Sequence, residues 1–99
     1  MKRDKFTLKT DANQSLIVKA LRAKGFSVAC THMVGGGFPD IIIGTINHQG
    51  KGMNILIEIK TKGKFLNKRE QAWFTDWKGQ ASIAYTPDEA IKIVEAMTK

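Results

Sequence analysis

The sequence predicts a mixed domain of the α/β or α+β class, with the element order αβββαβα and a mixed sheet flanked by helices. Two short runs rich in β-branched residues, 41–43 and 53–59, are separated by a polar turn that contains glycine, which is the pattern of an antiparallel hairpin. Amphipathic segments with helix start and stop signals lie before and after this hairpin. With 99 residues, the chain is long enough for a single domain (residues 1–99) but not for two.

A helix and a strand are expected before the hairpin. Apolar residues recur on one face between Asp11 and Lys24, and Gly25 supplies a stop signal. Residues 26–34 show a mixed alternation of apolar and polar side chains, which predicts the first strand. Residues 1–10 form a basic segment with four basic residues and one acid. Such blocks occur both as solvated tails and as arms that contact phosphates, and the sequence favours neither.

Two capping boxes mark the helix starts after the hairpin. Asn67 and Glu70 have the three-residue spacing of such a box. Thr86 and Glu89 form a second, with proline at the first helical position. The expected elements are a helix to about residue 78, a strand over residues 81–85 and a helix to about residue 97.

The formal net charge of +7 predicts attraction to polyanions, of which nucleic acid is the commonest partner. No apolar run approaches the length of a membrane span, and the charged start is not followed by an apolar segment. We therefore expect a cytoplasmic protein with no membrane partner. Cys30 stands alone and cannot form an internal disulfide, which fits a reducing compartment.

Acidic side chains interrupt both strands of the predicted hairpin. Asp40 stands at the start of the first strand, and Glu58 lies within the apolar run of the second. Lys60 follows Glu58 by two positions, so both side chains project from the same face. A charge inside an isoleucine run is costly to bury unless it is paired or holds a metal. The pattern indicates a site, although Lys60 alone is equally well explained as an edge-strand charge that discourages aggregation.

The proline–aspartate pair at 39–40 and the glutamate-x-lysine at 58–60 resemble the signature of the PD-(D/E)XK nuclease superfamily. The runs GGGFPDIIIG, EIK and KFLNKREQAWF are similar to its viral-type replication–repair nuclease (VRR-NUC) branch, and the resemblance spans about residues 11–97. It implies a restriction-endonuclease-like core of a helix, three antiparallel strands, a helix and a strand. It also implies an endonuclease that hydrolyses phosphodiester bonds in branched or duplex DNA, such as Holliday junctions, and that is in some cases virus- or phage-encoded.

The chemistry of such an enzyme explains why these residues would sit together. Mg²⁺ or Mn²⁺ activates water, neutralises charge on the phosphate oxygens and takes hard oxygen ligands, here Asp40 and Glu58. The resemblance adds the backbone carbonyl of Ile59 as a ligand. Lys60 would orient or deprotonate the attacking water, helped if its pKa is depressed. The resemblance also marks Gln71 as a catalytic residue, although an ordinary solvated helix residue fits that position nearly as well.

Two further metal assignments are weaker. The family often carries an acid near the start of the first helix that contributes to the metal site, and Asp11 is the candidate here. Asp11 could instead be only the N-cap of that helix, and we slightly favour this role. His32 and His48 could suggest zinc, but with one cysteine at irregular spacing they are better explained as a strand residue and a hairpin residue.

Basic and aromatic residues follow the predicted site. A cluster of four basic residues would hold phosphates beside the metal, or would simply be a solvated loop and helix start. These residues are Lys62, Lys64, Lys68 and Arg69. Trp73, Phe74 and Trp77 could stack on bases, but their helical spacing is more typical of packing.

A chain of this size has little surface with which to grip a branched duplex alone. The resemblance therefore implies a homodimer with two active sites, formed through the helix that carries Trp73 and Trp77 or through the strand at 26–34. The alternatives are a non-catalytic DNA-binding module and a nuclease subunit of a larger replication or repair assembly. The presence of Asp40, Glu58 and Lys60 argues against the first alternative, and the lack of an additional domain leaves the second open.

Overall fold

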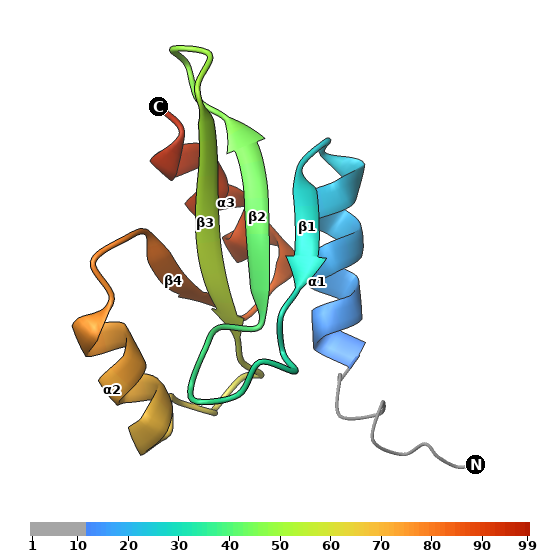
Figure 1. Ribbon diagram of the computed structural model, residues 1–99. Helices are drawn as coiled ribbons and strands as arrows, with labels where there is room; N and C mark the ends of the chain where they lie inside the picture. Colours follow the sequence, from blue (N-terminus) through green and yellow to red (C-terminus); the bar gives the residue numbers. More distant parts are fainter. Residues whose placement is uncertain (1–11) are drawn as a thin grey trace.

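The computed structural model describes residues 12–99, so the basic segment and Asp11 lie outside the described residues. The elements are α1 (Ala12–Ala23), β1 (Ser27–Cys30), β2 (Ile41–Ile46), β3 (Gly52–Ile59), α2 (Lys68–Asp76), β4 (Ala81–Ala84) and α3 (Pro87–Met97). The predicted mixed sheet flanked by helices is confirmed (Figure 1). None of the helices described in this part of the chain has the length and apolar character needed to cross a bilayer.

The sheet has the strand order β1-β2-β3-β4. The first two pairs are antiparallel, with Ile43 opposite Ile55 and Ile41 opposite Ile57 across β2 and β3. The chain then passes through α2 and returns so that β4 lies parallel to β3. This crossover leaves β3 as a central strand, paired with both β2 and β4 at Leu56 and Ile57.

One face of the sheet forms the core. The isoleucines that alternate along β2 and β3, at positions 41, 43, 55 and 57, are completely buried. Helices α1 and α3 pack against each other behind this face (Figure 1), and they contribute Ile17, Leu21 and Val94 to the same cluster. Burying each of these large aliphatic side chains contributes about 1.5–3 kcal/mol, so the hairpin is the most firmly fixed part of the molecule.

Strand β1 is shorter than the predicted 26–34, because the chain leaves the sheet after Cys30. Thr31 donates its backbone N–H to the Asp40 carbonyl at 2.7 Å and its hydroxyl to the Pro39 carbonyl at 2.8 Å. These two bonds close the 31–40 segment into a loop. Three consecutive glycines at 35–37 have positive φ within that loop, where an extended strand cannot continue.

The two predicted capping boxes differ in the structure. At α2 the box is complete: Asn67 Oδ1 accepts from the Glu70 N–H at 2.8 Å, and Glu70 Oε1 accepts from the Asn67 N–H at 2.9 Å. At α3 only half forms, since Thr86 caps the Glu89 N–H at 3.1 Å. The Glu89 carboxylate accepts instead from the N–H of Tyr85 at 2.7 Å, one residue before the cap.

Helix α2 lies to the side of the sheet and has no fully buried residue (Figure 1). Aromatic contacts attach it to the 31–40 loop: Phe38 packs edge-on against Trp73 at 5.4 Å between ring centroids and against Trp77 at 6.4 Å. Trp73 and Trp77 stack on each other at 4.7 Å. These contacts agree with the packing role predicted for the aromatic spacing.

The backbone of the 31–40 loop comes close to the start of α2 at Gly37. Replacing Gly37 therefore tests whether this close approach holds α2 against the loop. An added Cβ would lie 2.6 Å from the Arg69 carbonyl oxygen, at a φ of +85°. Gly36 has a φ of +67° and no atom within 4 Å, so Gly36→Ala carries only the backbone strain, about 1 kcal/mol. We expect Gly37→Ala to lose more stability than this control and to expose the α2 tryptophans.

Urea unfolding and tryptophan emission would measure both effects, because the two tryptophans of the chain are Trp73 and Trp77. A red-shifted emission of the folded Gly37→Ala variant, absent in Gly36→Ala, is the expected result. Identical behaviour of the two variants would show that the contact does not hold α2.

Candidate functional site

Strand register brings the two predicted acids together. Ile41 pairs with Ile57 at the start of β2, so one further step along the antiparallel register places Asp40 across from Glu58. The Asp40 side chain continues the ladder beyond the strand, since its Oδ2 accepts from the Ile59 N–H at 2.8 Å. The bonds from Thr31 fix the backbone on either side of Asp40, and Pro39 is fully buried. Asp40 is therefore held rigidly at the end of β3.

Glu58 is almost completely buried, with 3% of its surface exposed. Its Oε2 lies 3.4 Å from the Lys60 ammonium, as the two-residue spacing predicted. Its Oε1 is buried and has no hydrogen-bond partner among the described residues. The Lys60 ammonium pairs with the other oxygen, so Oε1 is desolvated without a hydrogen bond from residues 12–99.

A third carboxylate, Glu70 of α2, completes the charge cluster. Its Oε1 lies 2.8 Å from the Lys60 ammonium, closer than Glu58 does. The same oxygen accepts the capping bond from Asn67. The start of α2 and the end of β3 are thus tied together through one carboxylate oxygen.

The proton equilibria of the cluster follow from burial and crowding of like charge. Burial raises the pKa of Glu58 to about 8, with the charge of Asp40 next in effect. That value also includes the hydrogen bond with Glu70 and the charge of Glu70, which raise the pKa of Glu58, and the charge of Lys60, which lowers it. Burial also raises the pKa of Asp40, against the hydrogen bond from Ile59. For Glu70 burial is outweighed by the bonds from Lys60 and Asn67, so its pKa is lowered.

Lys60 does not have the depressed pKa that would suit a general base. Burial lowers its pKa, but the hydrogen bond to Glu70 and the charges of Glu58 and Glu70 outweigh that effect, so the pKa is raised. Lys60 is therefore an ammonium group in this structure. This raised pKa does not favour the predicted role of removing a proton, and the roles of orienting water and stabilising negative charge stay predictions.

The cluster lines a hollow of about 290 Å³. The lining residues are Gln14, His32, Asp40, Glu58, Ile59, Lys60 and Glu70. Gln14 belongs to α1 and is 5% exposed, with its Nε2 lying 3.3 Å from the Nδ1 of His32. The neighbouring Asn13 donates from one Nδ2 to the carbonyls of Lys60 and Tyr85, each at 3.1 Å, which fixes the start of α1 at this end of the sheet.

Three lining residues were not predicted for this site: Gln14, His32 and Glu70. The expectation of His32 as a strand residue was wrong, because β1 ends at Cys30 and His32 lies in the 31–40 loop. Gln14 stands three residues before the buried Ile17 on the apolar face of α1, and a polar side chain on such a face is a signal that could have been noticed. Glu70 was recognised only as a capping residue. Its approach to Lys60 depends on how α2 docks, which no local pattern reports.

The other predicted residues lie elsewhere. Gln71 is exposed and donates from its side chain to the Leu66 carbonyl at 2.9 Å, so it does not line the hollow. His48 is exposed in the β2–β3 hairpin, at the opposite end of β3 from Glu58 (Figure 1). The four predicted phosphate contacts are exposed in the loop and first turn that follow β3. These are Lys62, Lys64, Lys68 and Arg69.

The fit of a divalent cation depends on the oxygen atoms present. Within residues 12–99, no three His, Cys, Asp or Glu side chains form a preassembled metal site. The predicted set is smaller, with two carboxylates and the carbonyl of Ile59. It fits in chemistry, because carboxylate and carbonyl oxygens are the hard ligands that Mg²⁺ and Mn²⁺ take, and Glu58 Oε1 has no hydrogen-bond partner within residues 12–99.

No family model matches the sequence, and no curated protein or solved structure matches the chain.

The raised pKa of Glu58 predicts how stability depends on pH. Above pH 4.5 the unfolded chain releases this proton, whereas the folded chain keeps it to about pH 8. Folding thus takes up a proton, and without added metal the free energy of unfolding should fall as pH rises across this window. Asp40 acts in the same direction.

Glu58→Gln should remove most of that slope and stabilise the protein at pH 7 by about 1–3 kcal/mol. The exposed Glu95→Gln on α3 is the matched control. Urea unfolding in a chelator between pH 4.5 and 8.5 measures the effect. An unchanged slope in Glu58→Gln would show that the buried carboxyl is not the titrating group.

Proposed function

We propose that this protein is a metal-dependent endonuclease that hydrolyses DNA phosphodiester bonds, with selectivity for branched DNA such as Holliday junctions. One observation carries the proposal: two acids face each other at the end of β3 with Lys60 beside them, and the buried Oε1 of Glu58 lacks a partner within residues 12–99. In an arrangement that serves stability alone, we would expect both oxygens of a buried carboxyl group to have hydrogen-bond partners. The restriction-endonuclease-like core implied by the motifs forms part of the same proposal.

Asp40, Glu58 and the carbonyl of Ile59 would hold Mg²⁺ or Mn²⁺ in this hollow. The bound cation supplies Lewis-acid activation of water and neutralises charge on the phosphate oxygens. The protein would hold these ligands rigidly, since Asp40 is fixed by the Ile59 N–H and Glu58 pairs with Ile83 of β4 within the sheet. Preorganised ligands of this kind do not have to be ordered when substrate arrives.

Lys60 would act on the substrate as a cation. Its ammonium group is held between Glu58 and Glu70, within reach of the same hollow. From there it would orient the attacking water and stabilise charge on a phosphate oxygen. Because Glu70 holds Lys60 from α2, substrate contacts that move α2 would also reposition this lysine.

DNA and a second copy of the chain are the proposed partners. The exposed Lys62, Lys64, Lys68 and Arg69 would contact phosphates on the α2 side of the hollow. Two exposed apolar side chains of the 31–40 loop support a symmetric dimer: Met33 is 84% exposed and Val34 is 63% exposed. Twofold symmetry is the commonest arrangement of soluble homo-oligomers, and it would present two sites to one junction.

The first test concerns the acids. Asp40→Asn and Glu58→Gln should each abolish cleavage and weaken Mn²⁺ binding measured by calorimetry, because each removes an anionic oxygen. Linear, flap and four-way-junction DNA, with Mg²⁺ or Mn²⁺ and with chelator, are the substrates. Since Glu58→Gln should fold more stably than the native chain, its inactivity could not be attributed to unfolding. Full activity in either variant would overturn the nuclease proposal.

Lys60→Ala should lower turnover about 100-fold or more, with little loss of DNA affinity, because it removes a charge that acts on the reacting phosphate. Lys51→Ala, at the tip of the β2–β3 hairpin, is the matched control and should cut normally. Equal rates for the two variants would show that Lys60 is only an edge-strand charge.

The proposed homodimer is tested by measuring the molar mass of the protein in solution. Light scattering at micromolar concentration should give about twice 11.0 kDa, and Met33→Ser with Val34→Ser should shift the equilibrium toward monomer. Ile46→Ser, at an exposed position in β2 close to the hairpin turn, is the control. A monomer that still cuts four-way junctions symmetrically would contradict the stable dimer.

A further inference from the structure

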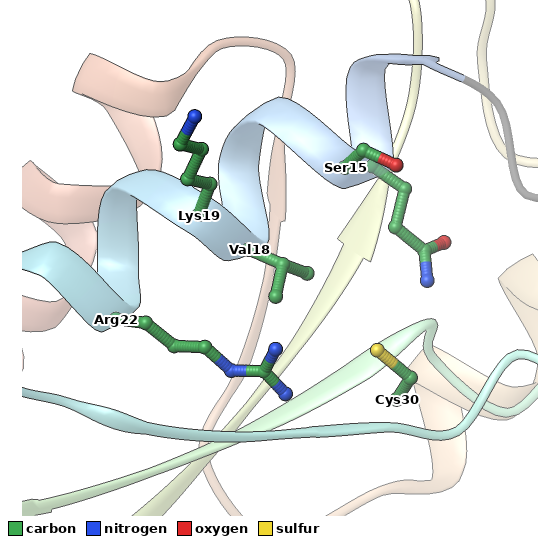
Figure 2. A pocket seen from close by; sticks show the side chains of 6 residues that line it. Ser15, Val18, Lys19, Arg22 and Cys30 are labelled. Carbon is green, nitrogen blue, oxygen red and sulfur yellow. The ribbon is translucent and has the colours of Figure 1, made fainter.

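A second hollow, of about 410 Å³, lies between α1 and β1. Its lining residues are Gln14, Ser15, Val18, Lys19, Arg22 and Cys30 (Figure 2). Gln14 also lines the hollow that holds the carboxylates, so the two cavities share a wall. We call this second cavity the α1–β1 groove. Its volume falls in the range of cavities that hold small organic groups.

The charge of the α1–β1 groove is entirely positive. Lys19 and Arg22 line it, and no acid does. Ser15, Lys19 and Arg22 are spaced by four and three residues, which places them on one face of α1. The side-chain ion pairs within residues 12–99 are both formed by Lys60. Lys19 and Arg22 therefore form no ion pair with an acidic side chain of that part of the chain. Their charge is available to an anion.

Arg22 is held in position before any ligand arrives. One guanidinium nitrogen donates to the Val28 carbonyl of β1 at 2.9 Å. Figure 2 shows Val18 and Arg22 directed from α1 toward the strand that carries Cys30, whereas the Lys19 side chain extends away from that strand. Arginine has five N–H donors in a planar fork, so the bond to Val28 leaves others for a phosphate. The largely buried Val18 supplies an apolar floor.

The positions of the basic residues define a path across the site. Helices α1 and α2 lie on opposite sides of the end of β3 where Glu58 is found (Figure 1). The basic residues that follow β3 therefore lie on one side of the carboxylate hollow, and the α1–β1 groove lies on the other. A strand that places a phosphate at the carboxylates would continue naturally into this groove.

We propose that the α1–β1 groove binds the sugar–phosphate backbone of a DNA strand on one side of the bond to be cleaved, with Lys19 and Arg22 contacting its phosphates. The identity of the polyanion rests on the proposed function, but the binding itself needs no catalysis. The contacts are to backbone, so they add affinity and register without reading sequence.

Cys30 provides a direct probe, because it is the single cysteine of the chain and is exposed in the groove. In chelator, where no cleavage occurs, saturating four-way-junction or duplex DNA should slow its reaction with a small maleimide. The control is Cys30→Ser combined with Lys51→Cys, which moves the thiol to the hairpin and should react equally with and without DNA. Unslowed labelling of Cys30 under saturating DNA would overturn the proposal.

Lys19→Ala combined with Arg22→Ala should weaken DNA binding and reduce the slope of log affinity against log salt by about two. Lys51→Ala combined with Lys92→Ala removes the same charge from exposed positions elsewhere and should change the slope less. Because Arg22→Ala also removes the bond to Val28, Lys19→Ala alone is included and should reduce the slope by about one. If the groove variants and the control pair change the salt dependence of DNA affinity equally, the result would contradict DNA binding in the α1–β1 groove.

These readouts separate the two proposals. If DNA protects Cys30 from labelling but the protein never cleaves DNA, the result would support DNA binding in the α1–β1 groove and contradict the nuclease proposal. The opposite result is cleavage that depends on Asp40 and Glu58, with Cys30 unprotected and the salt slope unchanged in Lys19→Ala. It would support the nuclease proposal and contradict DNA binding in the α1–β1 groove.

Discussion

The half-buried carboxyl group of Asp40 and the buried carboxyl group of Glu58 lie side by side at the end of β3 and impose the main constraint on this molecule. The Asp40–Glu58 pair is unfavourable in itself, since burial raises the pKa of both groups and the charge of Asp40 also raises the pKa of Glu58. The isoleucine hairpin offsets that cost: each fully buried isoleucine contributes about 1.5–3 kcal/mol. The pair persists because the register leaves it no other position. Under the proposed function, a bound divalent cation would offset the unfavourable charge of this pair.

The helices around the hairpin respond to that constraint in different ways. Helix α1 is anchored in the core through Ile17 and Leu21, so Gln14 reaches the site from a rigid support. Helix α2 has no such anchor and is attached through Phe38 and through the bond between Glu70 and Lys60. The site is thus bounded by one fixed element and one that is held by few contacts. Motion on binding is expected on the α2 side.

The sequence was most informative where local periodicity and long-range structure coincide. Alternating isoleucines fix strand register, and register alone was enough to bring Asp40, Glu58 and Lys60 together. Prediction failed where a tertiary contact decides the outcome. Loop closure by Thr31 ends β1 early, and the charge state of Lys60 depends on Glu70, which arrives from a separately docked helix.

Asn13 does not belong to the charge cluster, yet its side chain holds together two strands that run parallel. One amide nitrogen satisfies two carbonyls at once, one at the end of each strand. An aspartate has no hydrogen to donate there, a serine has one, and a glutamine places its amide a methylene further away. We therefore expect sequences that share this fold to allow almost no variation at position 13, even though the residue takes no part in chemistry. A position chosen for mutagenesis by its distance from the acids would miss it.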